Sequence, residues 1–354
     1  MLSEKLRPPW PELFLWVRQQ ITNLQPRSCT LLLKLCHVPK AHLLLLPFLL
    51  NCTGPNPESA ATGLPATADT AIAAAAEAPA PPLPDPPAPE LYAWLPAGRY
   101  RAAQTVAARF APPKGYQRVA VAAGSFGHWL RYLPLLPAGA PVKLYNGQLK
   151  DRQDVHAAVL DMDVGSRDLQ QCADAVIRLR AEYLFSQNPD QVHFHLTSGD
   201  DIGFRDWYSG RGFRVKGNDV LPAARPAEAP SHPNFRRYLD QIFTYAGTLS
   251  LSKELQPTPL AQVQAGDVLI RGGSPGHAVL VLDVAVQPAT GRRVVLLAQS
   301  YMPAQQMHVL TNLYDDTGLG AWFYLDPAQS RVGTPEWTFR STELGRFVQL
   351  QEDL

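Results

Sequence analysis

The most constraining feature of this 354-residue sequence is a run of ten residues, 277–286, with the sequence HAVLVLDVAV. Apolar residues occupy almost every position, which is typical of a strand buried on both faces of its sheet. Residues 288–291 (PATG) predict a turn, and residues 293–300 (RVVLLAQS) then return as an antiparallel partner. A short strand over residues 267–271 and a Gly-rich turn over residues 272–276 lead into the run. The chain is therefore expected to contain a buried antiparallel sheet.

A helix is predicted over residues 168–185 (DLQQCADAVIRLRAEYLF), because no Gly or Pro interrupts this stretch. Asp168 is expected to cap the helix, with Gln171 completing a capping box. Cys172 then lies in the first turn, where free backbone N–H groups and the helix dipole stabilise a thiolate and lower its pKa. In the other interpretation Cys172 belongs to an apolar stripe and is a core residue. The helix alone favours this second interpretation.

The helix precedes the sheet, which predicts an α+β fold. The composition becomes globular from Leu91 and no second linker follows, so residues 91–354 are expected to form a single domain. Further strands are expected over residues 142–145, 157–164, 191–196, 307–310 and 322–325, helices over 126–132 and 234–246, and a long surface excursion over 204–220.

Residues 1–52 have the features of an export leader. Lys40 precedes a short apolar run that ends in Leu49-Leu50-Asn51-Cys52 and resembles a bacterial lipobox, in which the cysteine is lipidated. The run is too short to span a bilayer. Because the region before it does not resemble a signal peptide, the true start is expected further in, at Leu33.

An Ala- and Pro-rich segment over residues 53–90 follows the leader and has almost no large apolar side chains. Such a segment cannot bury a core and predicts an extended tether. A tether placed directly after a lipidation site predicts a membrane-anchored protein of the cell envelope, on the periplasmic or outer-membrane face. The alternative is a cytosolic protein with an unusual N-terminus.

Charge and cysteine content limit the function classes. The formal net charge is +1, which gives no reason to expect a nucleic-acid partner. Of the four cysteines, Cys29, Cys36 and Cys52 precede the Ala- and Pro-rich segment, and Cys172 is alone in the part expected to fold. A disulfide framework within that part is therefore excluded.

Three polar residues are expected to converge at one end of the sheet. Cys172 starts a helix, and His277 starts a buried strand directly after a turn. A hairpin that turns about residues 289–290 places Gln299 and its neighbours opposite His277. Nucleophile, base and orienting group would then be Cys172, His277 and Gln299, the arrangement used for covalent acyl transfer.

An oxyanion hole is also expected beside the thiol. The backbone N–H of Cys172 would form it together with the side chain of Gln170 or Gln171.

Two sequence stretches, LQQCADAVIRL and GDVLIRGGSPGHAVLVLDV, resemble the papain-like cell-wall hydrolases of the NlpC/P60 and CHAP kinds. The resemblance implies a papain-like core, with N-terminal additions, of a helix packed on an antiparallel sheet. It also implies Cys172 as nucleophile, His277 as base and Gln299 as third residue, with Asp267 in a structural role. The segment between Cys172 and His277 is longer than in those families, and QQC replaces their glycine-containing approach to the cysteine.

A second resemblance covers most of the expected domain. The strings SFGHWLRYLPL, DVGSRDLQQCADAVIRLRAEYL, YAGTLSLSKEL, GGSPGHAVLVLDVA, LAQSYMPAQQMHVL and TPEWTF resemble the domain-of-unknown-function family 4846. The resemblance implies a bacterial lipoprotein or secreted protein and carries no established activity.

A metal site is the weaker interpretation of the segment that follows the helix. His193 and His195 lie on one face of a predicted strand, with Asp200 and Asp201 close behind. Without a metal-ligand spacing, two histidines on a half-exposed strand are the better interpretation. No metal or cofactor is therefore predicted.

Two further segments could line a substrate groove. Trp207 and Arg211 belong to an aromatic and arginine cluster that either binds substrate or packs the surface excursion onto the domain, and the sequence favours neither. Tyr301 follows Gln299 and is placed for a cleft wall, or equally for a strand crossover.

The leading hypothesis is a lipid-anchored α+β domain with thiol-dependent amidase or peptidase chemistry on peptidoglycan or peptides. The alternative is a non-catalytic binding or structural envelope lipoprotein of the same fold with an unreactive Cys172. The partners expected are the membrane, through the lipid anchor at Cys52, and the substrate.

Overall fold

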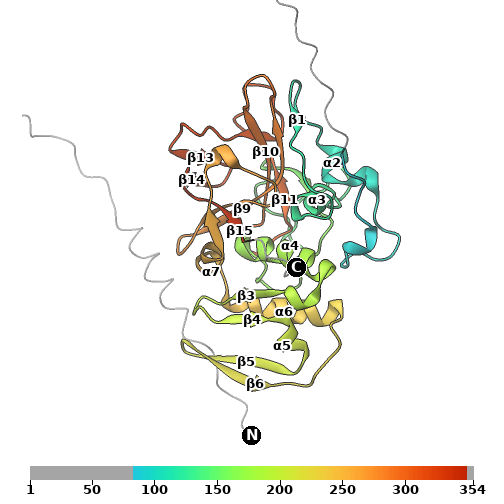
Figure 1. The fold of residues 1–354 in the computed structure, drawn as a ribbon, viewed down its shortest axis with the longest axis vertical. Coiled ribbons are helices and arrows are strands. Elements are labelled where there is room, and N and C mark those ends of the chain that lie inside the picture. The colour runs from blue at the N-terminus through green and yellow to red at the C-terminus, as the bar shows by residue number, and fades with distance from the viewer. Residues whose placement is uncertain (1–82, 349–354) are drawn as a thin grey trace, which may run out of the picture. The chain divides into compact units, whose positions relative to one another are not determined.

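A nine-stranded antiparallel sheet forms the larger part of the structure, a computed structural model that describes residues 83–348 (Figure 1). The strands lie in the order β2-β11-β10-β9-β8-β15-β7, with β1 paired to β9 and β12 paired to β10. Their bounds are β1 Gln117–Arg118, β2 His156–Val159, β7 Leu255–Pro257, β8 Val268–Arg271, β9 His277–Val286, β10 Arg293–Gln299, β11 His308–Leu310, β12 Trp322–Tyr324 and β15 Leu344–Phe347.

Helices and short hairpins complete the structure. The helices are α2 Val106–Arg109, α3 Phe126–Arg131, α4 Cys172–Gln187, α5 Phe204–Tyr208, α6 His232–Tyr245 and α7 Thr248–Lys253, with 3₁₀ turns η1 Pro89–Leu91, η2 Ala102–Gln104, η3 Pro189–Gln191 and η4 Leu260–Gln262. Three hairpins pair β3 His193–His195 with β4 Asp201–Gly203, β5 Arg211–Lys216 with β6 Asp219–Ala224, and β13 Arg331–Gly333 with β14 Thr338–Arg340. The α+β prediction is confirmed.

The β9–β10 hairpin has the predicted register at its turn end, where Val286 pairs with Arg293 and Asp283 pairs with Leu296. A β-bulge follows, because Val281 pairs with Leu297 and leaves Leu282 as the extra residue. The bulge reverses which residues face which side. Up to the bulge, the even-numbered Leu280 and Leu282 belong to the core under α4 and the odd-numbered Val281 to the opposite core. Beyond it, the even-numbered Val284 belongs to the opposite core.

Both faces of β9 are buried, as the sequence predicts. One face packs against α3 and α4 and joins the larger core. The other face packs against side chains from the chain segments before β8 and after β11. That second core contains Leu260, Val263, Leu269, Val279, Val281, Val284, Val295, Leu297, Leu310, Phe323, Leu325, Val332, Phe339 and Leu344.

Helix α4 lies between the large sheet and a smaller group formed by β3–β6, α5 and α6 (Figure 1). Its sheet side contacts β9 and β10. Its other side meets α6, where the rings of Phe185 and Phe235 stack with centroids 4.6 Å apart. Below these rings Glu182, which is fully buried, pairs with Arg178 at 2.6 Å and with His232 at 2.9 Å.

The segment predicted as a long surface excursion, residues 204–220, has regular secondary structure. Helix α5 and most of the β5–β6 hairpin occupy it. The Gly-, Arg- and aromatic-rich composition concealed strands that alternate half-buried with exposed side chains. The strand predicted over residues 142–145 is also wrong, since only isolated bridges at Lys143 and Leu144 occur there.

Contacts with the domain begin upstream of Leu91. The hydroxyl of Tyr132 donates to the Pro84 carbonyl at 2.7 Å, and the His128 ring bonds the Asp85 carbonyl at 2.9 Å. The predicted leader, its lipidation site at Cys52 and residues 53–82 of the tether lie outside the described residues. Within residues 83–348, no helix has the length and apolar content that crossing a membrane requires.

Candidate functional site

Cys172 is the first residue of α4, and Gln171 is the N-cap. The helix therefore starts four residues later than predicted, and the proposed cap at Asp168 is wrong. Asp168 instead accepts hydrogen bonds from the backbone N–H of Ala304 at 2.7 Å and from the Gln171 side chain at 3.0 Å. The cap is completed by Asp174, which accepts the N–H of Gln171 at 3.1 Å.

The electrostatics of Cys172 differ from the prediction. Burial raises the pKa of the Cys172 thiol, and the carboxyl of Asp174 raises it further. The backbone N–H groups of Ala278, Ala173 and Cys172 itself act in the opposite direction. The helix terminus thus does favour the thiolate, but desolvation is the larger effect and the predicted lowering of the pKa is wrong.

His277 is positioned by the turn between β8 and β9. The hydroxyl of Thr248 on α7 donates to the Gly273 carbonyl at 3.0 Å and accepts the Gly273 N–H at 3.2 Å. A Cβ at Gly276 would collide with the Gly273 carbonyl and the Thr248 hydroxyl, so only glycine fits there. The turn delivers His277 to the end of β9, where it is 2% exposed.

A buried chain of hydrogen bonds holds the His277 ring. Its Nε2 lies 2.8 Å from Oε1 of Gln299, and Nε2 of Gln299 donates to Glu336 at 2.6 Å. Lys150 Nζ bonds the other oxygen of Glu336 at 2.7 Å. Because Glu336 accepts, the Gln299 amide must turn its oxygen to His277, and this oxygen requires an N–H at Nε2. The neutral ring then has its lone pair at Nδ1.

Burial lowers the pKa of His277 to about 4, the positive charge of Lys150 lowers it as well, and the bond to Gln299 acts in the opposite direction. At neutral pH the ring is therefore uncharged. Together with the raised pKa of Cys172, this makes the pair a neutral thiol and a neutral imidazole in the unliganded protein.

Cys172 and His277 line one cavity of about 610 Å³. The thiol lies beside the N–H of Ala278, the residue after His277. Among residues 83–348 no hydrogen bond joins the thiol to the His277 ring, which is common for catalytic pairs without substrate. The rings of Tyr301 and Trp337 lie 4.9 Å and 5.2 Å from that of His277. Both belong to the cavity wall, as predicted for Tyr301.

Of the two side chains predicted for the oxyanion hole, Gln170 and Gln171, the structure places only Gln171 on the cavity. Gln170 is 1% exposed, and its side chain accepts from Arg178 at 3.1 Å in the interior. Gln171 lines the cavity next to Cys172. Gln171 is therefore the candidate on the cavity side, and its amide N–H already donates one hydrogen bond to Asp168.

Trp207 and Arg211 do not line this cavity, so the Cys172 site does not support their predicted substrate-binding role, which stays a prediction. Trp207 packs the β5–β6 hairpin onto the domain, with its Nε1 donating to Asn234 at 2.9 Å and Arg225 stacked over its ring at 4.0 Å. Arg211 pairs with Asp206 at the surface. The packing alternative describes both residues.

The other sequence candidates have structural contacts. His193 bonds Asp201 at 3.0 Å across the β3–β4 pair, and residues 83–348 contain no group of three or more side chains able to hold a metal ion. Asp267 is 1% exposed and accepts two hydrogen bonds from Arg346, at 2.6 and 2.8 Å. These contacts fit the structural role expected for Asp267.

Sequence reasoning missed Lys150, Glu336 and Asp174. Lys150 and Glu336 come from irregular segments that no periodicity marks, although Glu336 lies in the TPEWTF string. Asp174 was visible as an acid two residues after Cys172. It is 6% exposed, its Oδ1 has no partner within the described residues, and burial raises its pKa to about 8.

The fold and this site define a class of α+β protein with a thiol and an imidazole on one cavity. Residues 106–346 match the family model described as Domain of unknown function (4846), and the chain belongs to that family. No curated protein and no solved structure matches the chain.

Proposed function

We propose that this protein is a thiol-dependent amidase or peptidase in which Cys172 is the nucleophile, His277 the base and Gln299 the orienting residue. The observation that carries the proposal is the hydrogen-bonded chain from Lys150 through Glu336 and Gln299 to Nε2 of His277. A buried chain of this kind fixes one tautomer of the imidazole. His277 also lines the cavity that Cys172 shares, which a merely structural histidine does not require.

The two neutral groups support a general-base reaction. As the sulfur of Cys172 bonds to the carbonyl carbon, the thiol proton moves to Nδ1 of His277 and the carbonyl oxygen takes the negative charge. The oxyanion would accept hydrogen bonds from the N–H of Cys172 and the side chain of Gln171. The imidazolium then protonates the amine, the C–N bond breaks, and a thioester remains. Water, deprotonated by His277, hydrolyses that thioester to a carboxylic acid and the free thiol.

The cavity favours a polar, uncharged substrate. Nε1 of Trp337 is buried without a partner within the described residues, as is Oδ1 of Asp174. Both residues line the cavity, and the raised pKa of Asp174 keeps its carboxyl protonated at neutral pH. Unsatisfied polar atoms next to a cavity favour a ligand that has hydrogen-bonding groups of its own, as the amides of a peptide do. Peptide stems of peptidoglycan are one source of such groups.

The second candidate function is a binding protein without catalysis. The raised pKa of Cys172 favours it, because a thiol that resists ionisation is a poor nucleophile. In that case the cavity binds the same peptide groups and Cys172 only contributes to its wall.

Incubation of the purified protein with peptidoglycan fragments separates the two functions. New amino groups should appear with wild type and not with Cys172→Ala or His277→Ala, while Arg211→Gln, which lies outside the cavity, should retain full activity. Equal release by wild type and Cys172→Ala contradicts the hydrolase. Equal binding by both without release supports the binding protein.

We also propose that the protein is an envelope lipoprotein anchored through Cys52. The lipobox-like sequence before Cys52 and the Ala/Pro-rich segment after it support this location. Labelling of cells with a clickable fatty acid should mark the wild type and not Cys52→Ser. Equal labelling of the two proteins contradicts the anchor.

A further inference from the structure

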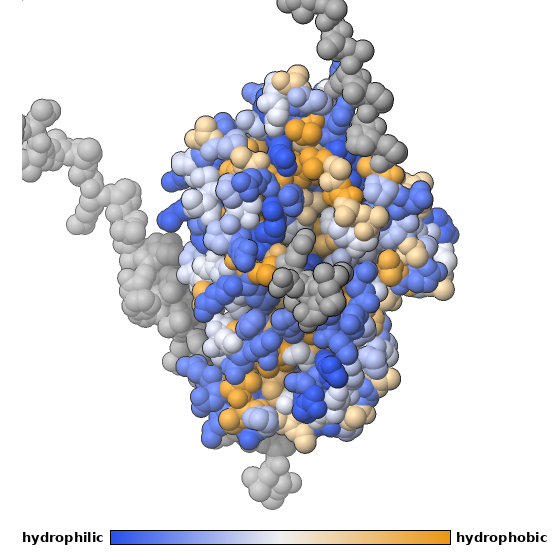
Figure 2. Space-filling model, in the orientation of Figure 1, coloured by the Kyte–Doolittle hydropathy of each residue, from blue (hydrophilic) through white to orange (hydrophobic). Residues whose placement is uncertain are grey.

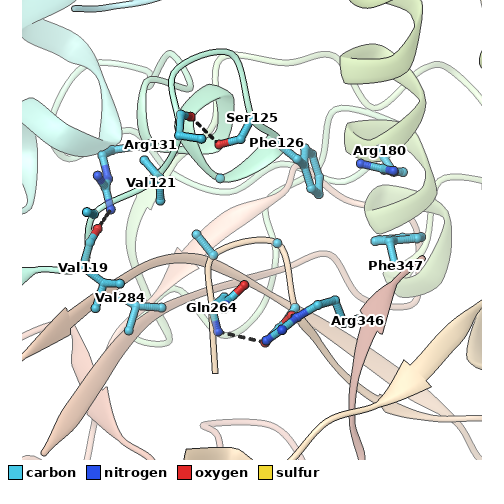
Figure 3. Close-up of a pocket in the computed structure, with 16 residues that line it drawn as sticks. Val119, Val121, Ser125, Phe126, Arg131, Arg180, Gln264, Val284, Arg346 and Phe347 are labelled. Atoms are coloured by element: carbon cyan, nitrogen blue, oxygen red, sulfur yellow. Dashed lines mark hydrogen bonds and ion pairs between the residues drawn. The ribbon is translucent and has the colours of Figure 1, made fainter. Parts of the chain in front are cut away.

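A second cavity lies at the opposite end of the sheet and shares no lining residue with the Cys172 cavity. It has a volume of about 260 Å³ and lies between α3, α4, the turn before β8 and the end of β15 (Figure 3). Val284, near the end of β9, forms part of its floor, whereas His277 begins the same strand. The proposed amidase chemistry leaves this cavity without a role.

Apolar side chains form part of the cavity wall, beside charged and polar ones. Val119, Val121, Phe126, Val284 and Phe347 contribute side chains to it. Figure 2 shows apolar side chains along the upper part of this face, in the region where Figure 1 places β1 and α3. A ligand that fills the cavity would therefore contact apolar side chains as well as charged ones.

Arg180 of α4 provides a positive charge without an acidic partner. Its guanidinium lies 5.2 Å from the ring of Phe126, 5.5 Å from that of Tyr183 and 5.2 Å from that of Phe347. Among residues 83–348 it forms no ion pair, although the charge of Glu254 acts on it from a distance. Figure 3 shows Arg180 beside Phe126 and Phe347 on one side of the cavity, with Arg131 on the other.

Arg131 adds an unsatisfied donor. It is fully buried, and its Nε and Nη2 bond Oδ1 of Asp283 at 2.9 and 2.6 Å. Its Nη1 has no partner within the described residues. Asp283 is shared with Arg118 at 2.7 Å, so one carboxylate faces two guanidinium groups.

The remaining acid does not supply the missing charge. Asp267 lines the cavity but is already bound by Arg346 through both of its oxygens. Within residues 83–348, Arg180 thus has no ion pair, and the single carboxylate of Asp283 serves two guanidinium groups. Apolar walls with an excess of guanidinium charge fit a ligand that combines a carboxylate with a hydrocarbon body, because guanidinium groups bind carboxylates through paired hydrogen bonds.

We propose that the cavity between α3, α4 and β15 is a binding site for a small organic carboxylate, with Arg180 as its main charged contact and Val121 and Phe126 on its apolar wall. The site is independent of the Cys172 chemistry.

The test uses the full-length chain and calorimetric titration with sodium hexanoate, 1-hexanol and inorganic phosphate at constant ionic strength. Hexanoate should bind the wild type. 1-Hexanol, which lacks the charge, and phosphate, which lacks the apolar body, should bind more weakly or not at all. Arg180→Gln should weaken hexanoate binding at least tenfold. The affinity of Arg180→Lys for hexanoate should lie between those of the wild type and Arg180→Gln, because the positive charge remains. Arg214→Gln, on β5 and outside the cavity, is the matched control and should bind as the wild type does.

A second variant separates volume from charge. Val121→Phe keeps every guanidinium group and fills the cavity at a half-buried position, so it should abolish hexanoate binding. Thermal unfolding in the absence of ligand shows that each variant is folded. The proposal is overturned if wild type does not bind hexanoate, if hexanol or phosphate binds as well as hexanoate, or if Arg180→Gln and Arg214→Gln bind it equally.

Discussion

The two ends of strand β9 both contain buried polar side chains, but their chemistry differs. At its start, His277 is held by neutral hydrogen bonds through Gln299, and the charged pair of Lys150 and Glu336 lies one step further away. Near its other end, Asp283 is clamped directly by two arginines. One end keeps a ring nitrogen unused beside a cavity, and the other satisfies both oxygens of its carboxylate.

This difference separates a site from a structural clamp. Asp283 lies at the β-bulge and ties α3 and β1 to the sheet through Arg131 and Arg118. Replacing Asp283 should therefore lower the free energy of unfolding. Of the two ring nitrogens of His277, only Nε2 forms a hydrogen bond within the described residues. Replacing His277 should therefore lower the free energy of unfolding less than replacing Asp283, and should mainly lower the reactivity of Cys172.

The largest effect is expected at the clamp. Asp283→Ala leaves two buried or nearly buried guanidinium groups without their acceptor, and it should lower the free energy of unfolding by about 3–5 kcal/mol. Urea denaturation measures this loss. The matched control is Asp154→Ala, which breaks the exposed pair with Arg152 and should leave stability unchanged. Equal losses in the two variants would show that Asp283 is no clamp.

A smaller, pH-dependent effect is expected at His277. Its pKa is about 4 in the folded protein and about 6.5 in the unfolded chain, so the unfolded chain binds a proton first as the pH falls. Above pH 6.5 the group contributes nothing; between pH 6.5 and 4 it should cost about 2–3 kcal/mol of stability. His277→Asn should remove this contribution to the loss of stability at acid pH.

The comparison between wild type and His277→Asn is needed because other groups titrate in the same range. Burial lowers the pKa of His308 to about 3, which gives a loss of the same sign in both proteins. Denaturation midpoints measured from pH 7 to pH 4 should therefore converge with falling pH. Parallel curves for the two proteins would mean that His277 is not buried in its neutral form.

The smallest effect on stability is expected at Glu336. Glu336→Gln keeps the shape of the side chain but removes the charge that binds Lys150, and it should cost about 1–2 kcal/mol. Glu90→Gln, at an exposed position, is the control and should cost nothing. The informative measurement is nitrogen NMR of the His277 ring, which should show a proton at Nε2 in the wild type and a mixture of tautomers in Glu336→Gln. An unchanged tautomer in the variant would show that Glu336 does not orient the ring.

Much of the large sheet could be predicted from the sequence, because its strands carry strong local signals. The apolar run of β9, the turn before β10 and the resulting register depend on residues near one another in the chain. The bulge at Leu282 could not be predicted, since apolar residues on both sides of it hide the change of face. The start of α4 was predicted too early because aspartate is a common N-cap residue. In the structure Asp168 instead accepts a hydrogen bond from the backbone of Ala304, a tertiary contact.

The site was predictable only in part. Cys172, His277 and Gln299 lie next to helix and strand boundaries, so their approach follows from local structure. Lys150 and Glu336 are brought to Gln299 from loops far apart in sequence, and only the tertiary fold reveals them. The desolvation of Cys172 is likewise a property of the folded interior.

Alkylation of Cys172 by iodoacetamide at pH 7 tests most directly the claim that Cys172 and His277 form one reactive site. The rate is measured by mass spectrometry in folded wild type, His277→Ala and Arg211→Gln. The account predicts that His277→Ala slows alkylation at least tenfold, because the imidazole no longer accepts the thiol proton, and that Arg211→Gln has no effect. Equal rates in wild type and His277→Ala, or a Cys172 that reacts only after unfolding, would contradict it.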